Sequence, residues 1–262
     1  MDKNKAVYKL KGLPPIYVIN LDDKPERWKF MEEQFKYWQI ENYHRISAYD
    51  GRGDNDLGDI LKGRYPDQMT SGEVGCVTSH LKALKMFLET DEPCLLMMED
   101  DCDISNVFHW GFTWKDFYSK IPYDYDVVQL AIINPASITV QLHKRYVNDF
   151  STACYLITRR HAQKLVDLHC RGDKYKLDQG MKPRAVADDL IYNSGNTFAI
   201  PLFLYKIELG SDIHDIHIDA FHKSSHEGLW QFWRNQSPDV NWNDMFEYNP
   251  YAGRLPPGFE AK

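Results

Sequence analysis

Four carboxylates stand within five residues at positions 99–103, where the sequence reads EDDCD. They follow the apolar run CLLMM at 94–98, which is typical of a strand buried on both faces. Ligands of open α/β sheets bind outside the carboxyl ends of such strands. Carboxylates this close repel one another and are costly to bury unpaired, and a divalent cation such as Mn²⁺ or Mg²⁺ relieves both problems. The run is therefore a candidate metal and diphosphate site.

A plainer interpretation of the acidic run is a solvated loop whose carboxylates cap a following helix. Its position directly after a buried strand favours the metal site. A calcium loop of the EF-hand type is excluded. Counting from Asp101, the sixth position is Asn106 instead of glycine and the twelfth is Phe112 instead of glutamate.

Two further groups of polar residues could take part in chemistry. Asp188 and Asp189 are candidates for a general base, because a carboxylate that faces a hydroxyl in a dry pocket can accept its proton. The alternative is that Asp188 is the N-cap of a helix and Asp189 lies in its first turn. His214 and His217 could offer an imidazole to a metal, or their alternating polar and apolar segment could be exposed.

Several common active-site patterns are missing from the sequence. Ser79 and His80 lie in a predicted helix without a GxSxG elbow, which disfavours a serine hydrolase. Neither GxGxxG nor GxxxxGK[ST] occurs, which disfavours a Rossmann dehydrogenase and a P-loop enzyme. Diphosphate recognition would have to come from a metal and side chains. The aromatic, basic-ended run at 229–234 could stack on an acceptor sugar, touch a membrane interface or lie in the core.

Charge and cysteine usage narrow the class of protein. The net charge of −7 argues against a nucleic-acid partner, which needs a basic surface. The five cysteines are scattered without a CxxC pair, which disfavours a zinc site and favours a reducing compartment. The chain shows no signal-peptide pattern and no apolar run long enough to span a bilayer. We expect a cytoplasmic protein, bacterial or virus-encoded in the host cytoplasm, with membrane contact at most peripheral.

Strands and helices alternate along the chain, and these elements must position the polar residues. The helix that begins after Thr70 has the strongest signal, because Thr70 and Glu73 fit a capping box. Residues 41–69 are predicted to be mostly loop. Residues 198–206 are predicted to form an edge strand or an irregular strand, because they include Pro201. Residues 211–262 have little periodicity and are predicted to form a tail wrapped over the domain. Strands are predicted at 15–21, 43–46, 94–98, 126–133 and 153–157, and helices at 26–40, 71–89, 159–168 and 187–192. The alternation predicts an α/β fold with a mostly parallel central sheet flanked by helices in one domain, residues 1–262.

Six blocks of the sequence resemble, in the same order, those of glycosyltransferase family 25, the lipopolysaccharide and collagen sugar transferases. The block at 70–80 followed by the EDD strand end is specific to the family, whereas the single short pieces are not. The blocks are IYVINL at 16–21 with Glu26 and Arg27 behind it, AYDG at 48–51, TSGEVGCVTSH at 70–80, LMMEDD at 96–101, TACYLI at 152–157 and LGSDI at 209–213.

This resemblance implies a GT-A fold, with a nucleotide-sugar half near 14–135 and an acceptor half with the tail near 136–262. It also implies a nucleoside-diphosphate sugar donor, UDP- or GDP-linked, a carbohydrate acceptor, a Mn²⁺-type ion and inversion at the anomeric carbon. Carried over by position, the catalytic base would be Asp189 or Asp188, and the metal ligands would be Asp101 and Asp103. His214 would be a third metal ligand by analogy with GT-A enzymes in general. The donor-binding residues would be Val18, Asn20, Leu21, Arg27, Ala48, Asp50, Ser79, His80, Glu99 and Asp100.

Three functions fit these observations. The first is an inverting, metal-dependent glycosyltransferase of glycan or lipopolysaccharide-like synthesis. The second is a sugar or nucleotide-sugar binding module on the same fold, in which the base would be dispensable. The third is a metal-dependent phosphohydrolase, which leaves the blocks at 16–21 and 70–80 unexplained. We expect the first.

Overall fold

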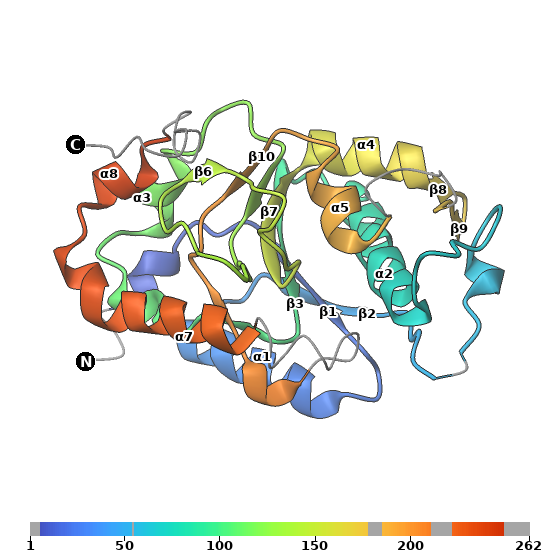
Figure 1. Ribbon diagram of the computed structural model, residues 1–262, viewed down its shortest axis with the longest axis horizontal. Coiled ribbons are helices and arrows are strands. Elements are labelled where there is room, and N and C mark those ends of the chain that lie inside the picture. Colours follow the sequence, from blue (N-terminus) through green and yellow to red (C-terminus); the bar gives the residue numbers. More distant parts are fainter. Residues whose placement is uncertain (1–5, 54, 178–184, 211–221, 249–262) are drawn as a thin grey trace.

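A seven-stranded sheet forms the centre of the computed structural model, which describes residues 6–53, 55–177, 185–210 and 222–248 (Figure 1). Its strand order is β2-β1-β3-β7-β5-β10-β6. The strands are β1 (Ile16–Asn20), β2 (Tyr43–Ser47), β3 (Cys94–Glu99), β5 (Val127–Gln129), β6 (His143–Lys144), β7 (Cys154–Thr158) and β10 (Thr197–Ala199). Two small antiparallel pairs are separate, namely β4 (Cys102–Asp103) with β11 (Leu204–Tyr205) and β8 (Cys170–Arg171) with β9 (Lys174–Tyr175).

The predicted mostly parallel sheet is confirmed. Strands β2, β1, β3, β5 and β10 run in one direction, whereas β7 is antiparallel to both β3 and β5 and β6 is antiparallel to β10. Hydrophobic periodicity locates a strand but does not encode its direction, so the reversal of β7 could not be read from its apolar pattern. The strand predicted at 126–133 is shorter than expected and ends at Gln129.

Helices cover both faces of the sheet (Figure 1). Strand side chains alternate between the faces, so Leu96 and Met98 of β3 enter one core while Leu95 and Met97 enter the other. The first core packs against α1 (Pro25–Trp38), α3 (Trp114–Tyr118), α7 (Lys223–Gln231) and α8 (Trp242–Phe246). The second packs against α2 (Ser71–Leu88), α4 (Arg159–His169) and α5 (Ala187–Tyr192). None of the helices in the described ranges is long and apolar enough to cross a membrane.

The capping box predicted for α2 is present. The Thr70 hydroxyl accepts a hydrogen bond from the Glu73 N–H at 3.1 Å, and the Glu73 carboxylate accepts one from the Thr70 N–H at 2.8 Å. These bonds satisfy backbone donors that a helix start leaves unpaired. The start of α2, which carries the longest sequence motif, is therefore fixed locally.

The tail predicted for residues 211–262 wraps over the domain at 223–246, as expected, but it is helical there, which its weak periodicity did not indicate. This segment forms α7, a π-helical turn (Phe232–Gln236), a 3-10 turn (Ser237–Asp239) and α8. Leu229, Phe232 and Trp233 are buried in the core, which explains why an aromatic-rich segment with a weak pattern is ordered. Other 3-10 turns are Val7–Leu10, Gly58–Ile60, Ser105–His109 and Ile207–Leu209.

Candidate functional site

A cleft lies at the carboxyl ends of β1, β2 and β3, where the sheet brings three of the sequence motifs together. Val18 does not line the cleft, because its side chain is buried in the core that contacts α1. The predicted residues that do line it are Asn20, Leu21, Arg27, Ala48, Asp50, Ser79, His80, Glu99, Asp100 and Asp101. Residues far apart in the sequence thus share one wall, as expected for a parallel sheet edge.

Glycines let the loop after β2 lie directly on α2. A methyl group at Gly75 would come within 2.7 Å of the Tyr49 carbonyl oxygen, and one at Gly51 would collide with the Ser71 carbonyl. The Ser79 hydroxyl accepts a hydrogen bond from the Tyr49 N–H at 2.8 Å and donates to the Gly75 carbonyl at 2.6 Å. Ser79 therefore fixes the cleft wall, and both of its hydrogen-bonding directions are already used.

Asp100 is the most fully paired carboxylate of the acidic run. Its Oδ1 accepts from Arg27 Nε at 2.7 Å and lies 2.6 Å from Arg27 Nη2, while its Oδ2 accepts from Asn20 Nδ2 at 2.6 Å. Asn20 is itself held, because its Oδ1 accepts from Arg45 Nε at 2.7 Å. All four groups join the ends of β1 and β3 to the start of α1. Asp100 thus stabilises the scaffold through a buried ion pair with little capacity left for a ligand.

Asp50 forms a second ion pair at the cleft. Hydrogen bonds from Arg52 lower the pKa of the Asp50 carboxyl to about 2, against the opposing effect of burial. The Arg52 guanidinium donates to Asp50 Oδ2 at 2.8 Å and to Asp23 Oδ2 at 2.6 Å. This arrangement fixes a cationic side chain in the cleft wall, where it could contact an anionic ligand.

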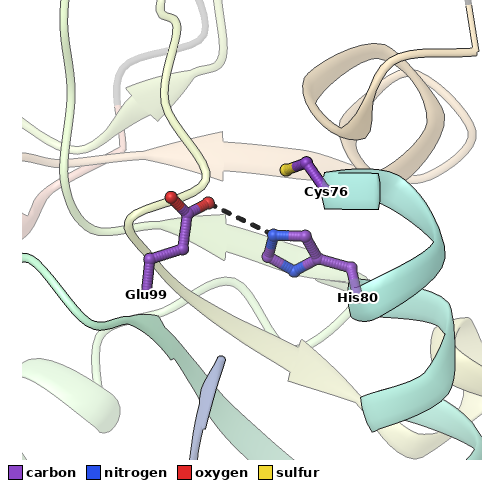
Figure 2. Close-up of side chains that lie close together, drawn as sticks. All are labelled: Cys76, His80 and Glu99. Atoms are coloured by element: carbon purple, nitrogen blue, oxygen red, sulfur yellow. Dashed lines mark hydrogen bonds and ion pairs between the residues drawn. The ribbon is translucent and has the colours of Figure 1, made fainter. Parts of the chain in front are cut away.

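Glu99 and His80 form a buried polar pair across the cleft floor (Figure 2). His80 Nε2 lies 3.2 Å from Glu99 Oε1, and His80 Nδ1 lies 2.9 Å from the Tyr155 hydroxyl. Thr152 donates to the same Glu99 oxygen at 2.5 Å. Burial would raise the pKa of Glu99, but the hydrogen bonds from His80 and Thr152 outweigh it and the pKa is lowered. Glu99 is therefore held as a carboxylate.

Cys76 lies beside this pair, and its sulfur could complete a metal site with His80 and Glu99 (Figure 2). The ligand atoms of the three side chains lie within 4.8 Å of one another. Burial, followed by the negative charge of Glu99, raises the pKa of the Cys76 thiol well above its usual value. Mn²⁺ and Mg²⁺ prefer oxygen ligands to a soft sulfur, so Cys76 is a poor ligand for these ions.

Asp101 differs from its neighbours in having a free oxygen. Its Oδ1 is buried and has no hydrogen-bond partner among the described residues. Burial, followed by the charge of Glu99, raises the pKa of the Asp101 carboxyl to about 7. Asp103 does not line the cleft, and its Oδ1 accepts from the Ser105 N–H at 2.8 Å. His214 and His217 lie outside the described residues.

The two candidate bases on α5 have different surroundings. Asp188 Oδ1 is buried without a hydrogen-bond partner in the described ranges, whereas Asp189 Oδ1 accepts from Asn193 Nδ2 at 3.1 Å. Burial raises the pKa of Asp188 to about 6, with Arg145 lowering it and Glu99 raising it. The alternative of Asp188 as N-cap is wrong, because Val186 occupies that position and Asp188 lies in the first turn.

Four residues near these carboxylates were not singled out from the sequence. Thr152 and Tyr155 belong to the strand block at 152–157 and act through their hydroxyl groups. Arg145 and Tyr192 lie next to each other in space, with the guanidinium carbon 4.6 Å from the ring centre. Of these four residues, only Tyr155 could have been noticed in the sequence, because its hydroxyl group stands within an otherwise apolar strand. The position of Arg145 depends on long-range packing.

Comparison with known proteins adds the following. The model of glycosyltransferase family 25 (LPS biosynthesis protein) matches residues 13–181. No curated protein matches the chain. Among solved structures, A197 from STIV is 12% identical, with a TM-score of 0.37 and coverage of 73% of this chain and 83% of that chain. The nucleoside-diphosphate-sugar pyrophosphorylase from Vibrio cholerae RC9 is 12% identical, with a TM-score of 0.32 and coverage of 78% and 77%.

Proposed function

The chain belongs to glycosyltransferase family 25, and from this premise we propose that it moves a sugar from a nucleoside-diphosphate sugar to a carbohydrate hydroxyl with inversion at the anomeric carbon. The observation that carries the proposal is that Asp188, whose buried Oδ1 has no hydrogen-bond partner in the described chain, lies close enough to the cleft residues Glu99 and Cys76 to interact with them electrostatically. A glycosyl transfer needs a site for the donor and a base for the acceptor, and these two features supply them.

The cleft is the donor site in this proposal. Its walls are set by ion pairs and by the close packing of loop 48–51 on α2, so little ordering is needed when a ligand enters. Arg52 lines it and offers positive charge to a diphosphate. Experiment must decide whether the nucleobase of the donor is uracil or guanine.

A divalent cation, Mn²⁺ or Mg²⁺, fits the donor set around Asp101. An unpartnered buried carboxylate oxygen beside the Glu99 carboxylate is an unfavourable arrangement that a hard cation would relieve. Asp101 would bind it through Oδ1, and His214 stays a candidate ligand. Asp103 is a weaker candidate than proposed from the sequence, because it lies outside the cleft. When bound, the cation would neutralise charge on the diphosphate.

Asp188 is the base that we propose for the acceptor. The acceptor oxygen forms a bond to the anomeric carbon, and its proton moves to Asp188 Oδ1. The bond from that carbon to the diphosphate oxygen breaks on the opposite face, and its electron pair leaves with the diphosphate. A carboxyl pKa of about 6 leaves Asp188 mostly ionised at neutral pH and more basic than an exposed aspartate.

A thermal-shift screen of UDP- and GDP-sugars with and without Mn²⁺, followed by a turnover assay, tests the function. A donor at a hundred times its dissociation constant should stabilise the fold by about 2.7 kcal/mol. Turnover that EDTA removes and Mn²⁺ restores is the expected result. Full activity in excess EDTA would contradict the metal role. Binding without turnover would favour the sugar-binding module, and phosphate release from simple esters would favour the phosphohydrolase.

A further inference from the structure

A cationic and an anionic side chain near the cleft each have a buried polar atom that makes no hydrogen bond within the described part of the chain. Arg145 Nη2 and Asp188 Oδ1 each have no hydrogen-bond partner in the described part of the chain. They nevertheless interact, because the charge of Arg145 lowers the pKa of Asp188. Unpaired buried polar groups are costly, so a pair of complementary groups held apart indicates that something else binds between them.

The Arg145 guanidinium is fixed by its other nitrogens. Nε donates to Gln129 Oε1 at 3.2 Å and to the Asp149 carbonyl at 3.1 Å, and Nη1 donates to Asn193 Oδ1 at 3.2 Å. The Tyr192 ring supports the planar group at 4.6 Å. Nη2 is the buried nitrogen of this group that has no hydrogen-bond partner in the described part of the chain, and its position is set before a ligand arrives.

Asp188 is held between the donor cleft and Arg145. The charge of Glu99, which lines the cleft, raises the pKa of Asp188, so the two carboxylates are close. Arg145 does not line that cleft. Tyr192 follows Asp188 on α5, and its hydroxyl donates to the Ser151 carbonyl at 2.8 Å. Arg145 therefore lies near Asp188 but outside the cleft that we assign to the donor.

We propose that Arg145 and Asp188 together bind the acceptor hydroxyl, an inference that rests on the glycosyltransferase function proposed above. The hydroxyl donates its hydrogen to Asp188 Oδ1 and accepts one from Arg145 Nη2. A hydroxyl suits this pair because it is both donor and acceptor. An ammonium group would be repelled by Arg145 and a carboxylate by Asp188, so the site selects a neutral alcohol.

The pairing also orients the reaction. One lone pair of the acceptor oxygen accepts from Arg145, and the other attacks the anomeric carbon. The hydroxyl proton moves to Asp188, the electron pair of the broken bond leaves with the diphosphate, and Arg145 keeps all its protons. Arg145 is thus an acceptor-binding residue that sets the direction of attack.

Hydrolysis of the donor tests the inference, because water is the smallest acceptor and is always present. With the UDP- or GDP-sugar that the wild type hydrolyses fastest, kcat for Arg145→Gln should fall by about tenfold to a hundredfold, equivalent to one charge-assisted hydrogen bond. The donor dissociation constant should be unchanged. Arg160→Gln is the matched control, since Arg160 is exposed and pairs with Asp126 at 2.7 Å away from the cleft.

Two further measurements separate this role from a structural one. Arg145→Lys keeps the charge but loses the planar guanidinium, so its kcat should also fall when it is measured well below the thermal midpoint, which the loss of the bonds to Gln129, Asp149 and Asn193 should lower. In an Asp188→Asn background, Arg145→Gln should lower kcat little further, because both residues act on one hydroxyl. A wild-type kcat in Arg145→Lys, or fully additive losses, would overturn the inference. Absence of turnover in the wild type would instead refute the proposed function.

Discussion

Two walls of the site use the same kinds of residue in opposite ways. The anchored wall, made of Asn20, Arg27, Ser79 and Asp100, has its polar atoms joined to one another and to the backbone. The open wall, made of Asp101, Arg145 and Asp188, carries buried polar atoms without partners in the described chain. Most of the motif residues at the cleft therefore belong to the scaffold, and we infer that the unpartnered atoms of the open wall are the ones that would contact ligands.

This difference has a physical basis. A paired buried ion holds chain segments together, and it loses that role if a ligand competes for it. An unpartnered buried group lowers stability but can act on a ligand without first breaking an internal bond. The comparison predicts that substitutions in the open wall change rate with little loss of stability, and that substitutions in the anchored wall do the reverse.

The largest expected effect is that of Asp188→Asn on turnover. Loss of the base should lower kcat by about 10²–10⁴-fold, because amide oxygen cannot take the acceptor proton. The fold should be at least as stable, since burial of the Asp188 charge, the largest cause of its raised pKa, is no longer required. Asp189→Asn is the matched control and should retain most activity, because Asp189 is bonded to Asn193. If Asp189→Asn abolished turnover and Asp188→Asn did not, Asp189 would be the base instead of Asp188.

Asp100→Ala should instead act on stability. It leaves the buried Arg27 without its main partner, so the free energy of unfolding should fall by about 3–5 kcal/mol in urea titrations. Asp22→Ala is the control, because Asp22 is exposed and its ion pair with Arg45 should contribute little. A stable Asp100→Ala protein with lost donor binding would place Asp100 in the open wall.

The smallest effect is the pH dependence of turnover. Asp188 must be ionised to accept a proton, and its pKa is about 6, so kcat should fall about tenfold per pH unit below that value with saturating Mn²⁺. Glu99 and Asp189 raise this pKa, Arg145 lowers it, and the nearby Cys76 thiol stays neutral. The acidic limb should therefore move to higher pH in Arg145→Gln. A pH profile that is identical in Asp188→Asn would contradict the assignment.

Much of the fold could be predicted from local signals. The capping box at Thr70 and Glu73 set the start of α2, and the apolar run at 94–98 located β3. Neither the direction of β7 nor the helical structure of residues 223–246 could be predicted, because both depend on packing against elements distant in sequence. Propensity and periodicity describe a segment, whereas tertiary contacts decide its partner.

The site shows the same division. Motifs predicted most of the residues that line the cleft, but they could not distinguish Asp100, whose two oxygens are both paired, from Asp101, whose Oδ1 has no hydrogen-bond partner in the described chain. They left Asp188 and Asp189 equivalent, although helix geometry points them to different surroundings. Arg145 had no signal at all, since its neighbour Tyr192 is far along the chain and reached only through the fold.

The reversed strand β7 has a consequence for engineering. The segment between β5 and β7 begins after Gln129 and ends opposite it, because Gln129 pairs with Tyr155, and between these points it contributes β6 to the edge of the sheet beside β10. Within that segment, Asp149 accepts from Asn134 at 2.9 Å and lies 3.1 Å from His143, so the segment has buried contacts of its own. Its two attachment points are adjacent, so a chimera joined there would replace the segment in one piece, provided that the pairing of β6 with β10 is kept. If the proposed function holds, such chimeras would change the surroundings of Asp188 and leave the cleft residues unchanged.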